Sequence, residues 1–352
     1  MACDDCDRCR ALGYKFCIKC GQDFSATAPV PSYRVEGGSS GTDLLHKSVL
    51  PSMALIMVLA VVSAIILVFN AGVTVDFLST YKSNLSLYFI DVFVLTTMTG
   101  TALQVFFVLV ATAAIASVIV LLYDSRNAFR IGSYDYLENT RKTSAYWVGL
   151  LLGSTLVIEL IVNFLMTLVG YAPETPGWIL EMTLPEAIFS FTKAAVWEEI
   201  AFRMMFMGVP MMVIAFCFRQ NGLRHLFGGT GVTKVGIVLT IISALLFAYA
   251  HVDGWGLWKM FPTIFGGLMF GYLYMRFGLH ACIVAHLVND FATVWLQVFG
   301  GFGSLMFLGV LFLGVVCIPV LVMKTLDGIR GIKDLQLTGF EKVQDSMDSN
   351  TD

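Results

Sequence analysis

Long runs of apolar residues recur along the chain, separated by short polar connections. Each run has about 17–25 residues with few or no charges, the length that an α-helix needs to cross a bilayer. The pattern predicts an all-α polytopic membrane protein with eight transmembrane helices, at about residues 49–70, 102–123, 145–170, 184–210, 235–251, 261–276, 279–297 and 304–323. A β-barrel is disfavoured because its strands alternate apolar and polar residues with a period of two.

One apolar stretch fits this pattern less well. "NLSLYFIDVFVLTTMTG", from Asn84 to Gly100, contains Asp91 and runs almost directly into the second predicted span. We expect it to form an interfacial or outer helix.

The polar parts of the chain divide it into domains. Residues 1–24 are short and rich in cysteine, and residues 25–47 are rich in Pro, Gly and Ser, which predicts a flexible linker. The membrane domain is expected to cover residues 48–323, and residues 324–352 predict a polar cytoplasmic tail.

Basic residues are distributed unevenly between the connections. The connections after the second and fourth spans are rich in them, and hold Arg126, Arg130, Arg141, Lys142, Arg219, Arg224 and Lys234. The alternate connections hold only Lys82 and Lys259. Because basic loops stay in the cytoplasm, we expect a multi-pass protein of the cell membrane with both termini in the cytoplasm.

Overall composition agrees with this class. Hydrophobic residues make up 57% of the 352 residues and charged residues 13%, whereas a soluble protein is about half apolar and a quarter charged. The net charge of −3 provides no basic surface, so nucleic acid is not an expected partner.

Five of the eight cysteines lie in "CDDCDRC" and "FCIKCG" near the N-terminus. Two C-x2-C pairs suit a tetrahedral thiolate site, and a cytoplasmic setting disfavours disulfides. The segment resembles the zinc ribbons of many prokaryotic membrane proteins, and we expect one structural zinc held by Cys3, Cys6, Cys17 and Cys20. Cys9 is spare, although Cys6 with Cys9 is an alternative first pair. The other three cysteines lie in apolar runs and are expected to be small buried residues: Cys217, Cys282 and Cys317.

Charged residues interrupt the fourth span, in "AVWEEIAFRMMF" from Ala195 to Phe206. A charge at the bilayer centre costs about 2.5–3.5 kcal/mol on insertion scales, so it indicates a functional site. Glu199 and Arg203 are four residues apart on one helix face, in the order that favours an ion pair. Glu198 is rotated by about 100° and is able to face another group, although Arg203 could reach both carboxylates.

Two histidines of the later spans complete a set of polar residues. His251 ends "LLFAYAH", and His286 lies in "CIVAHLVND" with Asn289 and Asp290 within about one turn. One Glu, two His and one Asp in apolar helices suit the activation of water or the binding of a metal. Taken singly, each motif is more often a structural contact between helices than a catalytic group. We expect Glu159 in "VIELIVNF" to be structural or supporting.

The motifs E-E-x-x-x-R, F-x-x-x-H and H-x-x-x-D follow one another on three spans. In this order they resemble the CPBP (Abi) family of intramembrane proteases, which includes the type II CAAX prenyl endopeptidases. The resemblance covers about residues 184–297. It implies that Glu198 is the general base, that Glu199 and Arg203 support it, that His251 orients the water or shares a metal, and that His286 and the residue four positions later face the scissile carbonyl oxygen.

That last residue is Asn in many members and Asp290 here. An ionised Asp cannot donate a hydrogen bond to an oxyanion. Four alternatives follow: Asp290 is protonated, Asn289 supplies the donor, Asp290 orients His286, or Asp290 helps to hold a metal. A catalytic divalent metal on Glu198, His251 and His286 and a metal-free activation of water both stay open.

The sequence therefore predicts an intramembrane endopeptidase that acts on a membrane-associated protein or peptide. Prenylated CAAX proteins, leader-bearing peptides and unlipidated membrane proteins are all candidate substrates. A non-catalytic membrane adaptor or transporter, with the same residues as ion sites, is the alternative. Counting spans places His251 towards the outer end of its helix, whereas CAAX processing needs access from the cytoplasm.

Overall fold

The computed structural model describes residues 6, 41–88, 92–129, 136–171 and 173–339. It forms two compact units, Met1–Leu44 and Leu45–Asp352. Of the predicted zinc ligands only Cys6 is among the described residues; Cys3, Cys17 and Cys20 lie outside them, as does the spare Cys9.

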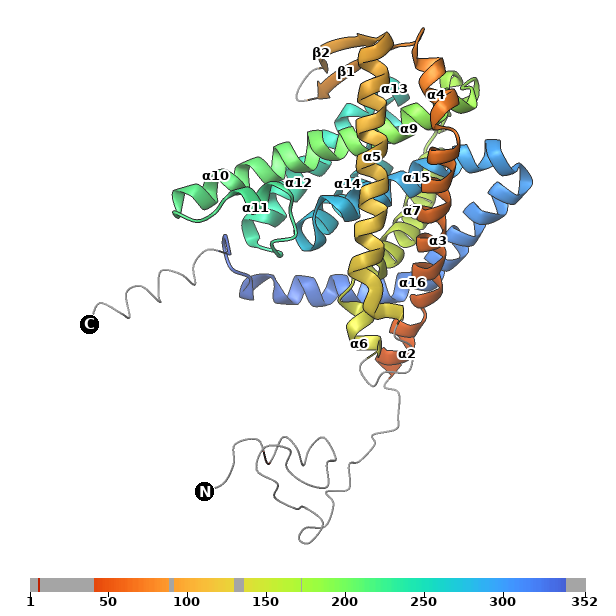
Figure 1. Ribbon diagram of the computed structural model, residues 1–352. Coiled ribbons are helices and arrows are strands. Elements are labelled where there is room, and N and C mark those ends of the chain that lie inside the picture. Colours follow the sequence, from red (N-terminus) through yellow and green to blue (C-terminus); the bar gives the residue numbers. More distant parts are fainter. Residues whose placement is uncertain (1–5, 7–40, 89–91, 130–135, 172, 340–352) are drawn as a thin grey trace. The chain divides into compact units, whose positions relative to one another are not determined.

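The second unit is a bundle of long helices (Figure 1). They are α3 (Leu50–Phe69), α5 (Gly100–Asp124), α7 (Ser144–Leu168), α9 (Leu184–Glu199), α12 (Lys234–Ala250), α14 (Met260–Phe277), α15 (Leu279–Phe299) and α16 (Gly301–Gly331). Helix α9 continues through the π-helical segment η2 (Ile200–Gly208) into α10 (Val209–Cys217). Each of the eight predicted spans coincides with one of these helices, which confirms the all-α membrane fold.

Short elements connect the long helices. They are α2 (Gly41–Lys47), α4 (Ala71–Leu78), η1 (Ser125–Phe129), α6 (Tyr136–Arg141), α8 (Gly177–Leu180), α11 (Leu223–Leu226), α13 (Val252–Trp255), η3 (Leu257–Lys259) and η4 (Ile332–Asp334).

Helix α14 differs from the other predicted spans. Among the described residues, seven helices are long and apolar enough to cross a membrane, and α14 is not one of them. Its sequence, "MFPTIFGGLMFGYLYMRF", is diluted by glycine, tyrosine and arginine. The helix packs against α7, α12 and α15, and most of its residues are buried, so it needs little apolar surface of its own.

The stretch from Asn84 to Gly100 is not the helix that we predicted. It forms an antiparallel hairpin of β1 (Lys82–Tyr88) and β2 (Val92–Thr99), which packs beside the start of α5. The residues alternate in β1 and are rich in Val and Thr in β2, and both features favour a strand over a helix. An isolated hairpin is marginal in water, so its contacts with the helices stabilise it.

Small residues set the closest helix contacts. A Cβ added to Gly314 of α16 would collide with the carbonyl oxygen of Gly153 on α7. A Cβ on Gly267 of α14 would lie 2.8 Å from the Cα of Ala244 on α12. Helices in lipid associate through such close approaches because the hydrophobic effect does not drive them together.

The last long helix extends beyond the predicted span of residues 304–323. Helix α16 continues past Met323 as far as Gly331. The chain then returns to α12, where the amides of Lys234 and Val235 donate to the carbonyls of Gln336 and Leu337, both at 3.0 Å. These bonds satisfy backbone donors at the N-terminal end of α12 that have no partner within the helix.

The three cysteines of the predicted membrane domain differ in burial. Cys282 and Cys317 are buried, as predicted, but Cys217 is exposed. Cys217 is the last residue of α10 and lies on the outer surface of the bundle, so an apolar run alone did not determine its burial.

Candidate active site

The two adjacent glutamates end α9, and the helix widens to a π-helix immediately after them. Pro210 follows the widened segment; it has no amide proton for the carbonyl of Phe206, and its ring would collide with that carbonyl in a continuous α-helix. Arg203 lies inside the π-helical segment, and such segments are frequent at functional sites.

Glu199 is the centre of a fully buried polar network. Its Oε1 lies 2.7 Å from Nδ1 of His286 on α15, and its Oε2 lies 3.3 Å from Nε of Arg203. Neither Glu199 nor Arg203 has any exposed side-chain surface. The predicted ion pair is thus present, and it joins α9 to α15 through His286.

The Arg203 guanidinium is enclosed mainly by aromatic rings. Its Cζ lies 4.3 Å from the ring centre of Phe247 and 5.0 Å from that of Phe270, and Nη2 donates to the carbonyl of Gly267 at 3.3 Å. Arg203 contacts Glu199 and not Glu198, which leaves Glu198 available for other groups.

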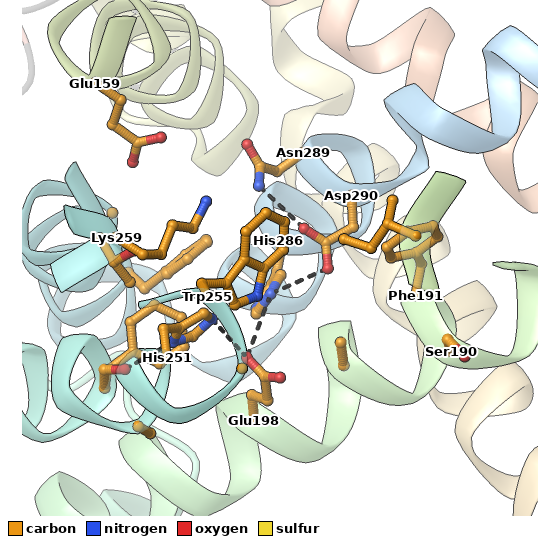
Figure 2. Close-up of a pocket in the computed structure, with 18 of the residues that line it drawn as sticks. Glu159, Ser190, Phe191, Glu198, His251, Trp255, Lys259, His286, Asn289 and Asp290 are labelled. Atoms are coloured by element: carbon orange, nitrogen blue, oxygen red, sulfur yellow. Dashed lines mark hydrogen bonds and ion pairs between the residues drawn. The ribbon is translucent and has the colours of Figure 1, made fainter. Parts of the chain in front are cut away.

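Glu198 faces both histidines (Figure 2). Its Oε2 lies 3.8 Å from Nε2 of His286 and 4.0 Å from Nε2 of His251. Nδ1 of His251 donates to the carbonyl of Phe247 at 2.8 Å, so its Nε2 carries the lone pair when the ring is neutral. Oε2 of Glu198 is buried with no hydrogen-bond partner among the described residues. A water between Glu198 and His251 would donate to both.

Asp290 approaches the same ring nitrogen of His286 as Glu198, and Asn289 lies next to Asp290 (Figure 2). Oδ2 of Asp290 is 3.4 Å from Nε2 of His286, and its Oδ1 accepts a hydrogen bond from Nδ2 of Asn289 at 3.0 Å. The Asn289 amide has a second proton that this bond does not use. His286 is therefore close to three carboxylates: Glu199 at Nδ1, and Asp290 and Glu198 at Nε2.

A cavity of about 600 Å³ opens above these side chains. Residues of α7, α8, α9, α12, α13, α14 and α15 line it, and Glu198, His251, His286, Asn289 and Asp290 all contribute to its wall. Helix α12 ends at Ala250, and His251, Asp253, Gly254 and Trp255, which follow it directly, line the cavity.

The separations around Glu198 are wider than those of a zinc site. Two ligands of a tetrahedral zinc are about 3.4 Å apart, since each lies about 2.0–2.1 Å from the metal. The Glu198–His286 and Glu198–His251 separations of 3.8 and 4.0 Å are wider. Among the described residues no group of three His, Cys, Asp or Glu is arranged to hold a metal. The arrangement therefore suits a water better than a metal.

Sequence reasoning missed part of the cavity wall. Glu159 of α7, which we expected to be structural or supporting, lines the cavity, and Trp255 and Lys259 project into it from the connection after α12. The Lys259 ammonium lies 4.4 Å from the ring centre of Trp255. A charge in a span pointed to Glu159, whereas nothing in the pattern distinguished Lys259 from an ordinary loop lysine.

Comparison with known proteins identifies one region. Residues 180–292 match the family model described as type II CAAX prenyl endopeptidase Rce1-like. This range includes Glu198, His251, His286, Asn289 and Asp290, together with α9, α12, α14 and most of α15. No curated protein and no solved structure gave a significant match.

Proposed function

Because residues 180–292 form a domain of the Rce1-like type II CAAX prenyl endopeptidase family, we propose that the chain cleaves peptide bonds inside the membrane with a Glu198-activated water. The family supports an intramembrane endopeptidase.

The observation that carries the proposal is the placement of Glu198. Its orphaned Oε2 faces Nε2 of two histidines at 3.8 and 4.0 Å in the wall of a cavity large enough for a peptide segment. A carboxylate, a histidine acceptor and a water in contact with both make a general-base site.

In the proposed first step, the water donates one hydrogen bond to Glu198 and the other to Nε2 of His251. Glu198 takes the proton as the water oxygen forms a bond to the scissile carbonyl carbon. His251 is held in the required tautomer by its bond to the carbonyl of Phe247.

The negative charge that develops on the carbonyl oxygen needs donors. Glu199 holds His286 through Nδ1, so Nε2 of His286 is directed towards the cavity as one donor. The unused amide proton of Asn289 is available as a second donor. Asp290 then orients both groups, through its contacts with Nε2 of His286 and Nδ2 of Asn289.

In the second step the carbon–nitrogen bond breaks, and the proton held by Glu198 passes to the leaving amine. The first products are a carboxylic acid and an amine, which exchange one proton to leave as a carboxylate and an ammonium group, and Glu198 returns to its starting state. Each atom and proton is accounted for by one water and the peptide bond.

The substrate is proposed to be a membrane-associated protein or peptide. A test is to compare new C-termini and released peptides from membranes that carry the parent or Glu198→Gln. Peptides released only by the parent support the proposal. Identical sets of peptides from the two membranes would favour the alternative, a non-catalytic membrane adaptor or transporter.

The absence of a metal requirement is part of the proposal. Exhaustive treatment with a strong chelator should leave the cleavage rate unchanged. The experiment uses a variant without residues 1–24, so that zinc from the predicted ribbon cannot confuse the result. A rate that disappears with chelation and returns with zinc would instead place a metal between Glu198 and the histidines.

A further inference from the structure

The structure groups the connections of the bundle at two ends. Tyr81, just before β1, donates to Oε1 of Glu186 at the start of α9 at 2.9 Å, and burial beside this carboxylate raises the pKa of Tyr81 to about 12. Nε2 of Gln297 near the end of α15 donates to the carbonyl of Met182 at 3.1 Å. The hairpin, the connection before α9 and the end of α15 therefore lie at one end of the bundle.

The cavity mouth belongs to this same end. Trp178 of α8 meets Trp255 of α13 edge-to-face, with ring centres 6.0 Å apart, and both line the cavity. Asp253 and Gly254 line it too and are exposed. Figure 1 shows α13, α4 and the hairpin together at one end, with α6 at the other. Tryptophans are enriched where protein meets the membrane surface, which suits a mouth at that level.

The remaining connections meet at the opposite end. The Ser144 hydroxyl donates to Asp124 at 2.7 Å, which joins the start of α7 to the end of α5. The amide of Leu279 donates to the carbonyl of Phe227 at 2.8 Å, which joins the start of α15 to the connection after α10. Backbone amides at the start of α12 donate hydrogen bonds to carbonyls of the segment after α16.

The two ends of the bundle differ in their number of basic residues. Connections at the cavity end hold Lys82 and Lys259, and the connection before α9 has no lysine or arginine. Connections at the other end and the last turns of α16 hold Arg126, Arg130, Arg141, Lys142, Arg219, Arg224, Lys324, Arg330 and Lys333. A bias of this size in short connections sets the orientation of a membrane protein, with the basic end in the cytoplasm.

We propose that the cavity opens on the non-cytoplasmic face, and that its substrate is an unprenylated segment of a membrane-associated polypeptide that reaches the site from that face. A prenylated C-terminus carries its lipid in the cytoplasmic leaflet, on the side away from the mouth. The part of this proposal that concerns the substrate rests on the proposed endopeptidase function. The part that concerns the orientation of the cavity does not depend on it.

Two glycines at the mouth allow a direct test. A Cβ on Gly254 or on Gly177 would meet no atom within 4 Å, so cysteine fits at either position without displacing a neighbour. Gly328 of α16 is equally open and lies between basic residues at the other end, which makes Gly328→Cys the matched control.

The full-length variants are expressed in a bacterial host, and spheroplasts are treated with a membrane-impermeant maleimide before and after permeabilisation. We expect Gly254→Cys and Gly177→Cys to react above the parent background in intact spheroplasts, and Gly328→Cys to react only after permeabilisation. The reverse pattern would overturn the orientation and leave the endopeptidase proposal untouched.

Substrate class is tested on detergent-solubilised protein, where both faces are accessible. Matched membrane peptides with and without a C-terminal prenylcysteine are compared. We expect cleavage without the prenyl group, and an absolute requirement for it would overturn this part of the inference. Failure of every peptide, with Glu198→Gln indistinguishable from the parent in membranes, would count against the endopeptidase and not against the labelling result.

Discussion

Replacing Glu199 with Gln should separate the supporting role of this residue from the proposed chemistry of its neighbour. Glu199 is fully buried and contacts Nε of Arg203 at 3.3 Å and Nδ1 of His286 at 2.7 Å. The substitution keeps the volume and an oxygen that accepts from His286, but it removes the charge that balances Arg203.

The cost is dominated by Arg203. Leaving one partner of a buried ion pair without the other costs about 3–5 kcal/mol. The bond to His286 changes from a charged to a neutral acceptor, which adds about 1 kcal/mol. Aromatic rings and one carbonyl surround Arg203 and offer no replacement anion. Glu199→Gln should therefore lose about 4–6 kcal/mol of unfolding free energy.

The assay is reversible unfolding in mixed micelles, with Glu198→Gln as the matched control. Oε2 of Glu198 has no hydrogen-bond partner among the residues that the structure describes, its shortest histidine contact is 3.8 Å, and a quarter of its side chain is exposed. The control should therefore stay within about 0.5–1 kcal/mol of the parent. Adding Arg203→Met to Glu199→Gln should recover most of the loss, because a buried ion pair is often replaceable by apolar groups. A Glu199→Gln variant as stable as the parent would refute this reasoning.

Three further predictions address other parts of the molecule. Asp290→Asn should lower the cleavage rate at least about tenfold with little change in stability, because Asp290 orients His286; a rate equal to the parent's would indicate an oxyanion donor at this position. Gly314→Val should destabilise the fold by about 1–3 kcal/mol because its Cβ meets the backbone of Gly153, whereas Gly309→Val on the same helix, which meets only a leucine methyl group at 3.4 Å, should be tolerated in the same unfolding assay. Cys17→Ser should abolish zinc binding by the full chain and Cys9→Ser should not, as measured by metal analysis of the purified proteins; equal losses would mean that the predicted ligand set is wrong.

The long helices were predictable because lipid imposes a simple requirement. A segment that crosses the membrane must be apolar over about 20 residues, and this pattern is visible in any one segment without knowledge of the rest. The hairpin at Lys82–Thr99 was not predictable in the same way, since an apolar stretch of that length is compatible with a helix or with two strands. Its contacts with the helices decide between them.

The candidate site was predictable in its members and not in its arrangement. Charges in apolar helices are rare enough to single out Glu198, Glu199 and Arg203. The sequence could not show that Glu199, and not Glu198, bonds His286, because that depends on the rotation of α9 against α15. The π-helical turn and the projection of Lys259 into the cavity likewise depend on packing between distant segments.

The central claim is that Glu198 activates the water that cleaves the peptide bond. Its most direct test is the single-turnover cleavage rate of a membrane peptide by purified, reconstituted parent protein and by Glu198→Gln, compared at equal folded fraction. The account predicts a loss of about 10²–10⁴-fold, the usual contribution of a well-placed general base. A Glu198→Gln variant that cleaves as fast as the parent would contradict it.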